Sequence, residues 1–341
     1  MLTPPAGLGT AAVAEAVAKH WGVRVRRLRY LALGAGSYHW LARTEEGARY
    51  FLTVDDLRDK PWLGADPEAA FAGLRAAFDT ALALRERAML PFVVAPMSAS
   101  GGQTACRLTP LYSLAVFPFV GGQTGHWGDE LTTQDRDALA DLLASLHLAT
   151  PAVAARALRR GMELHGRAAL ETALSDLGRP WSSGPFAEPA RRELVAKAAL
   201  VTDLLAAFDS LAARVSAIGE PLVVTHGEPH PGNIMRTDDG LCLIDWDTVA
   251  LAPPERDLWM LDDGSPGALA RYSDVTGRSV NSDAISFYRL AWTLTDVAAY
   301  TGQLRSAHHR SRDTERALTA LRKSLEPEPS ARPGPFRHRR G

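Results

Sequence analysis

Residues 225–247 read THGEPHPGNIMRTDDGLCLIDWD, and this stretch constrains the fold more than any other part of the chain. The apolar run PLVVTH that leads into it is typical of a buried strand. The next part, HGEPHPGN, contains two prolines and two glycines, so it cannot continue as a regular strand or helix. Two apolar runs, IM and LCLI, then flank an Asp-Asp-Gly turn. We therefore expect a strand, an irregular loop and a β-hairpin in that order.

The predicted hairpin brings two oxygen-bearing side chains together. Asn233 stands just before its first strand and Asp245 just after its second, so the two are expected to be neighbours. An amide oxygen and a carboxylate are hard ligands of the kind that Mg²⁺ takes beside phosphate oxygens. Glu228 lies in the same loop, where a carboxylate can accept the proton of an attacking hydroxyl. The stretch predicts a metal–phosphate site with a general base; the alternative is a polar turn joining two core strands.

The loop resembles that of the aminoglycoside phosphotransferase family, small-molecule kinases with the protein-kinase-like fold. Their catalytic loop runs H-G-D-x-x-x-x-N and is followed by an I-D-x-D or I-D-x-G strand end. Here the loop reads H-G-E from His226, with Asn233 at the same spacing, and I-D-W-D follows from Ile244. The stretch is most similar to the spectinomycin-type antibiotic kinases. The resemblance covers roughly residues 20–310.

The resemblance implies a role for each residue that matches the family pattern. Asn233 and Asp245 would hold Mg²⁺ against the phosphates of ATP or GTP. Glu228 would orient and deprotonate the acceptor hydroxyl, and His226 would support the loop through hydrogen bonds. Asp257, in the following ALAPPERDL, matches the family's structural acidic residue.

Two positions depart from the family pattern. The family has aspartate where this chain has Glu228, and a misplacement of about 1 Å can cost about 100-fold in rate. Thr53, in the strand RYFLTVDDL of the expected nucleotide site, stands where the family has a lysine that grips the phosphates. The nearest lysine is Lys60, which we interpret as a solvated surface residue. The alternative is that Lys60, reaching the phosphates from its loop, or an arginine substitutes for the missing lysine. The acidic partner expected for a phosphate lysine is Glu68 or Glu86 on the next helix.

Further nucleotide contacts are expected in two segments. The turn GAGSYHW lies where the family's phosphate-covering loop lies, so Gly34, Gly36 and Ser37 are candidate phosphate contacts. An ordinary hairpin turn is the alternative interpretation. FPFVGG resembles the lobe connection whose backbone groups hold adenine, with Phe117 and Phe119 as the candidate residues.

The substrate site is less clearly marked in the sequence. In the helical segment AWTLTDVAAY, Asp296 lies where the family places acidic groups that bind cationic antibiotics, and Tyr300 follows one turn later. The alternatives are an aspartate that is satisfied in the core or faces solvent, and an aromatic residue that packs in the core.

Hydrophobic periodicity divides the chain into a strand-rich and a helix-rich part. After a helix at residues 9–20, alternation predicts three strands with turns at 34–36 and 45–47. A helix follows from Asp66, and residues 91–97 and 106–122 predict two more strands. The remaining segments have a period of about 3.6, which is typical of helices.

We therefore predict an α+β fold of the bilobal protein-kinase-like type. Residues 1–120 would form an N-lobe with a small antiparallel sheet and a helix that bind nucleotide. Residues 121–325 would form a larger helical C-lobe with the catalytic loop and the substrate pocket. The Pro-rich, basic tail at 326–341 is predicted to be disordered.

Composition excludes several function classes. Among 341 residues, 38 Lys and Arg nearly balance 39 Asp and Glu, which argues against a nucleic-acid partner. The chain shows neither a signal-peptide pattern nor an apolar run of about 20 residues that would span a membrane. Cys106 and Cys242 are far apart and are interpreted as free thiols. A cytoplasmic protein is expected, and the sequence indicates no oligomeric state.

The sequence thus predicts a small-molecule kinase with Mg²⁺ as cofactor and ATP or GTP as phosphoryl donor. The acceptor would be a hydroxyl of an aminoglycoside, an aminocyclitol or a related polar metabolite. The alternative is a pseudokinase that binds nucleotide or ligand and has lost transfer. Thr53 and Glu228 favour the alternative, whereas the two metal ligands, Asn233 and Asp245, argue against it.

Overall fold

A computed structural model describes residues 1–326 except residues 6, 220 and 266, so the predicted tail lies outside the described residues beyond Glu326. The chain divides into two compact units. The first combines residues 1–163 and 210–289, and the second combines residues 164–209 and 290–341. The predicted lobe boundary at residue 120 falls inside the first unit, and the extent of the lobes stays a prediction.

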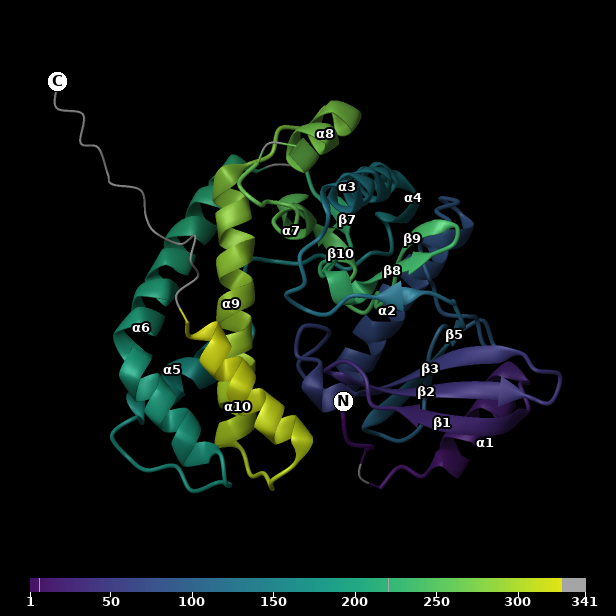
Figure 1. Ribbon diagram of the computed structural model, residues 1–341, viewed down its shortest axis with the longest axis horizontal. Coiled ribbons are helices and arrows are strands. Elements are labelled where there is room, and N and C mark those ends of the chain that lie inside the picture. The colour runs from purple at the N-terminus through teal and green to yellow at the C-terminus, as the bar shows by residue number, and fades with distance from the viewer. Residues whose placement is uncertain (6, 220, 266, 327–341) are drawn as a thin grey trace. The chain divides into compact units, whose positions relative to one another are not determined.

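The first unit contains an antiparallel sheet with the strand order β1-β2-β3-β5-β4 (Figure 1). The strands are β1 (Val25–Leu31), β2 (Ser37–Thr44), β3 (Arg49–Asp56), β4 (Cys106–Arg107) and β5 (Tyr112–Pro118). Thr53 of β3 lies opposite His39 on β2 and Ala115 on β5. Because successive side chains of a strand point to opposite faces, Thr53 and Asp55 share one face of β3.

Two helices cover the two faces of this sheet, α1 (Thr10–Trp21) and α2 (Pro67–Glu86). Alternation along β5 decides which residues meet which helix. Leu114 and Val116 belong to the core cluster that includes α1, whereas Ala115 and Phe117 belong to the cluster that includes α2. The predicted α+β class is confirmed by this sheet and by the helices that follow it.

The strand predicted at residues 91–97 is wrong. Only Val93 makes a bridge there, to Leu243, and the chain is otherwise irregular. Pro91 and Pro96 lack the N–H group that a strand needs in order to pair. The apolar residues of this segment are nevertheless buried, so its hydrophobic pattern reports core packing without a sheet.

The rest of the first unit carries the loop and the hairpin predicted from residues 225–247. Its elements are η1 (Leu57–Asp59), β6 (Gln123–Thr124), α3 (Thr133–Leu148), α4 (Thr150–Val153), β7 (Val223–Thr225), η2 (Pro231–Asn233), β8 (Ile234–Thr237), β9 (Gly240–Leu243), β10 (Ala250–Ala252), α7 (Glu255–Leu258) and α8 (Gly267–Thr276). β8 and β9 form the predicted hairpin, in which Ile234 pairs with Leu243. β7 pairs with β10, so the loop starts from a fully buried two-stranded sheet.

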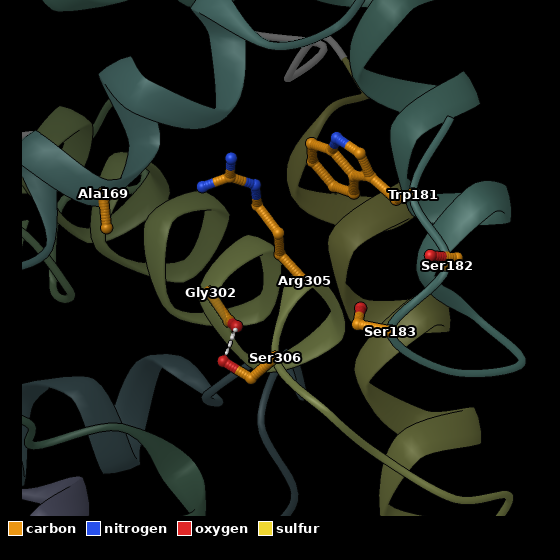
Figure 2. Close-up of a pocket in the computed structure, with 7 residues that line it drawn as sticks. All are labelled: Ala169, Trp181, Ser182, Ser183, Gly302, Arg305 and Ser306. Atoms are coloured by element: carbon orange, nitrogen blue, oxygen red, sulfur yellow. Dashed lines mark hydrogen bonds between the residues drawn. The ribbon is translucent and has the colours of Figure 1, made fainter. Parts of the chain in front are cut away.

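The second unit is helical in its described part. It contains α5 (Arg167–Ser175), α10 (Arg312–Ser324) and parts of α6 (Ala187–Ile218) and α9 (Ser282–Arg305). An open pocket of about 450 Å³ is lined by Trp181, Arg305 and small residues, and none of the predicted site residues lines it (Figure 2). Across the described residues, no helix is both long and apolar enough to cross a membrane.

The start of α2 offers a test of how local sequence sets the fold. Asp66 caps this helix by accepting hydrogen bonds from the backbone N–H groups of Glu68 and Ala69 at 2.9 and 2.8 Å. We expect Asp66→Ala to lower the free energy of unfolding by about 1 kcal/mol, because two N–H groups lose their acceptor. Asp66→Ser should retain most of the wild-type free energy of unfolding, because the serine hydroxyl can still accept a hydrogen bond. Urea denaturation followed by circular dichroism measures both, and an equal loss in the two variants would contradict the cap.

Candidate active site

The loop after β7 can form only with glycine at position 227. Gly227 has a φ of 101°, and a Cβ built there would lie 2.2 Å from Nη2 of Arg256. That guanidinium is itself engaged, because it donates to the hydroxyl of Thr225 at 2.8 Å and to the carbonyl of Thr248 at 2.9 Å. The loop backbone therefore lies directly on the Arg256 side chain, which ties it to both flanking segments.

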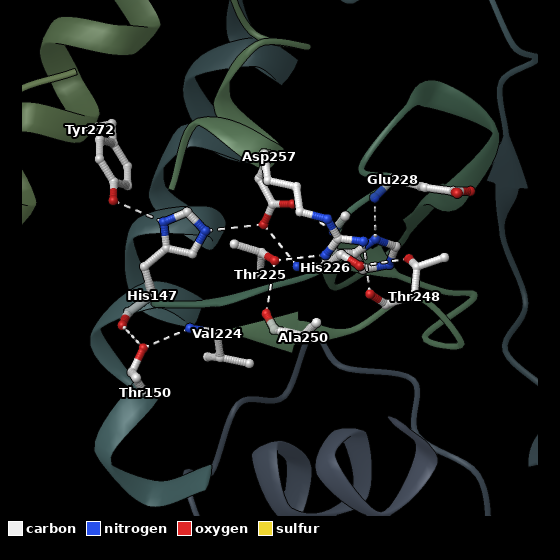
Figure 3. A network of polar contacts seen from close by, with 12 residues as sticks. His147, Thr150, Val224, Thr225, His226, Glu228, Thr248, Ala250, Asp257 and Tyr272 are labelled. Atoms are coloured by element: carbon white, nitrogen blue, oxygen red, sulfur yellow. Dashed lines mark hydrogen bonds and ion pairs between the residues drawn. The ribbon is translucent and has the colours of Figure 1, made fainter. Parts of the chain in front are cut away.

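Asp257 anchors the same loop through its side chain (Figure 3). Its buried carboxylate accepts the backbone N–H groups of His226 at 2.8 Å and Gly227 at 2.6 Å. His147 of α3 lies 3.0 Å from the same carboxylate through Nε2, and its Nδ1 lies 2.8 Å from the hydroxyl of Tyr272. Burial alone would raise the pKa of Asp257, but the hydrogen bond and charge of His147 hold that pKa below its usual range.

His226 connects the start of the loop to the end of the hairpin. Its Nδ1 accepts the backbone N–H of Glu228 at 3.2 Å, so Nε2 carries the proton and donates to the carbonyl of Ile244 at 2.9 Å. The ring also contacts Trp246 edge-on, with centroids 4.6 Å apart. Burial lowers the pKa of His226, which keeps the ring neutral in this arrangement. His226 therefore links the start of the loop to the end of the hairpin, and its role in the active site stays a prediction.

The structure brings Glu228, Asn233 and Asp245 to one end of the hairpin. Nδ2 of Asn233 donates to the backbone carbonyl of Glu228 at 3.0 Å, which turns its Oδ1 away from that carbonyl. The backbone N–H of Ile244 donates to the carbonyl of Asn233 at 3.0 Å, which sets Asp245 beside the loop. The three predicted side chains thus come from one continuous hydrogen-bonded segment.

Asp245 occupies an unfavourable backbone conformation in an acidic environment. It is one of two non-glycine residues with positive φ among the described residues, at 66°. The residue is exposed, yet loss of hydration beside the surrounding protein and the charge of Asp247 raise the pKa of its carboxyl group well above the usual range. Glu228 and Asp55 add to this effect, and Lys60 opposes it. The site therefore carries more negative charge than its neighbouring side chains neutralise.

The interpretation of Lys60 as a solvated surface residue is wrong, because its side chain is buried with only 2% of its surface exposed. Its Nζ lies 2.5 Å from Asp247 and 3.0 Å from Asp55, and it donates to the hydroxyl of Ser37 at 3.1 Å. The expected helix partners are also wrong. Glu68 is exposed and pairs with Arg107, and Glu86 is exposed at the end of α2.

The predicted nucleotide residues of the sheet are found in varied surroundings. Gly34 and Gly36 have positive φ, at 63° and 84°, as a tight turn requires. Ser37 is buried, and its hydroxyl donates to Asp55 at 2.6 Å. Thr53 lies 3.3 Å from Nδ1 of His39 through its hydroxyl. Their contacts to phosphate stay predictions.

The two phenylalanines proposed near adenine differ in burial. Phe117 is packed in the core, where it contacts Phe78 of α2 edge-on with centroids 5.6 Å apart. Phe119 is half-buried, and the guanidinium of Arg49 lies 4.0 Å above its ring. Phe117 therefore supports the strand from inside, while Phe119 is the more accessible of the two. A role of either residue in holding adenine stays a prediction.

Comparison with known proteins identifies the family. The model of the Phosphotransferase enzyme family matches residues 27–288. The chain belongs to this family. It is a phosphotransferase that acts on hydroxyl acceptors, which confirms the enzyme class expected from the sequence.

This phosphotransferase is also similar to individual proteins. It is 27% identical to Protein StrN of Streptomyces griseus over 261 residues, which covers 74% of this chain and 77% of StrN. The spectinomycin phosphotransferase solved with ADP and spectinomycin has a TM-score of 0.72 at 17% identity, covering 94% of this chain and 96% of that one. A microcompartment-associated aminopropanol kinase has a TM-score of 0.60 at 16% identity, covering 92% and 95%. These likenesses confirm the predicted kinase-like fold.

Sequence patterns indicate no role for two charged residues of the phosphotransferase, Asp247 and Arg160. Asp247 lies in the quoted I-D-W-D stretch, so its position was visible but its partner, Lys60, was not. Arg160 carries no motif, yet it lies close enough to Glu228 and Asp247 for their charges to act on it. Burial lowers the pKa of Arg160 to about 10. Nothing in the local sequence around Arg160 indicates this position.

The two proposed substrate residues lie on α9 in the second unit. Asp296 is partly buried, and the hydroxyl of Ser324 donates to it at 3.4 Å. Burial raises the pKa of Asp296 to about 6. Tyr300 is also partly buried, which raises its pKa to about 12. Their role in binding substrate stays a prediction.

Gly227→Ala tests the close contact between the loop and Arg256. We expect it to lower the free energy of unfolding by more than about 3 kcal/mol, because strain at positive φ adds to the displacement of a buried guanidinium. Gly240→Ala is the matched control, since its φ of 115° is equally unfavourable but no atom lies within 4 Å of the added Cβ. Denaturant unfolding of both variants measures the difference, and equal losses would show that backbone strain alone matters.

Asp296 makes a pH-dependent contribution to stability. Its folded pKa of about 6 exceeds the ordinary 3.8, so the folded state binds the extra proton and stability falls as pH rises from about 4 to 6. Asp296→Asn should therefore be more stable than the wild type at pH 7.5, by up to about 3 kcal/mol, and similar to it at pH 4. Thermal unfolding across pH measures this, with Asp203→Asn on α6 as an exposed control. An unchanged pH profile in Asp296→Asn would contradict the assignment.

Proposed function

We propose that this phosphotransferase transfers the γ-phosphoryl group of ATP or GTP to a hydroxyl of an aminocyclitol-like or related polar small molecule, with Mg²⁺ as cofactor. The observation that carries the proposal is the convergence of Glu228, Asn233 and Asp245 on one hydrogen-bonded loop and hairpin. The spectinomycin complex among the similar structures supports the choice of acceptor class.

The donor set fits a magnesium ion that is shared with phosphate oxygens. Across the described part of the chain, no cluster of three or more His, Cys, Asp or Glu side chains could hold a metal unaided. Mg²⁺ in kinases typically takes only one or two protein ligands beside the substrate phosphates, and Asn233 and Asp245 supply an amide and a carboxylate oxygen. Loss of hydration and the negative charge of Asp247 raise the pKa of Asp245, and the same negative charge favours a cation there. When bound, the ion would neutralise charge on the phosphate oxygens.

Glu228 is proposed to accept the proton of the acceptor hydroxyl at its carboxylate. Its backbone is clamped on both sides, because its N–H donates to His226 and its carbonyl accepts from Asn233 and from the N–H of His230 at 2.8 Å. The backbone therefore has little freedom to retreat and compensate for the extra methylene. We infer that a side-chain rotamer of Glu228 sets the distance to the acceptor.

The acceptor class is proposed from complementary charge. Asp296 would face an amino group of the substrate, and Tyr300 would lie one turn away on α9. The aminopropanol kinase among the similar structures extends the class to amino alcohols. The pseudokinase alternative depended on Glu228 and on Thr53, which stands where the family has a lysine. The buried Lys60 beside Asp247 weakens the argument from Thr53, because it supplies a cation nearby.

The test is phosphate transfer from ATP and GTP over a panel of aminoglycosides, spectinomycin, choline and aminopropanol. Glu228→Gln should lower kcat by about 10²- to 10⁴-fold, because the amide cannot accept the proton. Glu228→Asp keeps a carboxylate and should retain more activity than Glu228→Gln. Thermal shift with Mg²⁺ and nucleotide should be similar in all three proteins. Equal transfer rates in all three would rule out Glu228 as the base, and a wild type inactive on every acceptor would count against the proposed class.

A further inference from the structure

The ammonium group of Lys60 is fully engaged by groups from three separate segments. It has three N–H donors, and three acceptors lie within 3.1 Å: Asp247 after β9, Asp55 at the end of β3, and Ser37 at the start of β2. Ser37 also donates to Asp55, so the four side chains form one closed network. Lys60 therefore links the glycine turn and β3 to the segment that carries Asp245.

The charge at this position is secured by its partners. Burial alone would lower the pKa of Lys60, but the charges of Asp247 and Asp55 raise it above the usual range. The ammonium is therefore a permanent positive charge in a dry environment. The network contains two carboxyl groups, those of Asp55 and Asp247, for one ammonium. Oδ2 of Asp55 is buried without a hydrogen-bond partner among the described residues.

The position of Lys60 is explained by the absence of the expected phosphate lysine from β3. Thr53 stands where the phosphate lysine was expected, and it lies on the same face of β3 as Asp55. A lysine at position 53 would therefore point toward the carboxylate that Lys60 contacts. The cation reaches this place instead from the segment that follows η1.

We propose that Lys60 is a positioning residue for phosphoryl transfer, whose buried ammonium replaces the missing strand lysine and fixes Asp247, and through it the metal ligand Asp245. The inference rests on the proposed function. Asp245 needs such a support, since a non-glycine residue at positive φ costs about 1–3 kcal/mol and persists only when its surroundings hold it. The two residues that follow Asp245 are both held in place. Trp246 is buried in the core, and Asp247 forms an ion pair with Lys60.

The decisive experiment restores the cation from the other segment. Lys60→Met should lower kcat by about 100-fold and weaken binding of a fluorescent ATP analogue in Mg²⁺ by at least about tenfold, because Asp245 loses its fixed position. Binding of the same analogue in EDTA should change much less. Thr53→Lys combined with Lys60→Met should recover at least about tenfold of the loss in both readouts. Lys19→Met, at an exposed position of α1, is the control for loss of a lysine.

Lys60→Met leaves two buried carboxylates unpaired and can fail to fold, so a second variant is needed. Asp247→Asn leaves Lys60 paired with Asp55 and weakens only the link to the metal segment. It should lower Mg²⁺-dependent nucleotide affinity by at least about fivefold while circular dichroism stays unchanged.

Each outcome separates the two proposals. A wild type without Mg²⁺-dependent nucleotide binding would overturn the proposed function, and this inference with it. If the wild type binds the nucleotide but Asp247→Asn and any folded Lys60→Met bind it equally well, only the role of Lys60 is overturned. A loss in Lys60→Met that Thr53→Lys does not restore, with Asp247→Asn unchanged, also overturns it.

Discussion

The site depends on the hydrogen bonds between the carboxylate of Asp257 and the backbone of the loop that begins at His226. The carboxylate accepts two consecutive backbone N–H groups of the loop and is itself held by His147 from α3. A buried carboxylate needs such donors, since an uncompensated charge in the core is costly. With these hydrogen bonds formed, the loop has a conformation that only glycine at position 227 permits. The proposed base Glu228 and the proposed metal ligands Asn233 and Asp245 thus depend on a core interaction that none of the three makes directly.

Charge balance links this loop to the sheet. Asp55, Asp245, Asp247 and Glu228 act on one another, and Lys60 is the buried cation among them. A lysine with three acceptors holds its partners at fixed distances, whereas an exposed lysine would leave them mobile. The remaining negative charge favours a divalent cation, and an anionic phosphate group would be held there only through such a cation. The electrostatic arrangement therefore agrees with the chemistry of the family.

Local features of the site could be predicted because they depend on residues close in sequence. The hairpin at β8 and β9 follows from its turn residues, and the neighbourhood of Asn233 and Asp245 follows from the hairpin. The helix that begins after Asp66 follows from its cap. The strand expected at residues 91–97 failed because apolar composition reports burial, whereas pairing also requires N–H donors that prolines lack.

The residue pattern alone was enough to predict the family, the loop and the identity of the groups proposed to face the metal. The burial of Lys60 could be seen only in the folded chain, because its carboxylate partners are Asp55, close by, and Asp247, which is 187 residues away in the sequence. Spacing patterns describe contacts within a few turns or one hairpin. An ion pair between distant segments depends on how the chain packs, and the energy of burying a charge is set only when that packing brings its partners within reach.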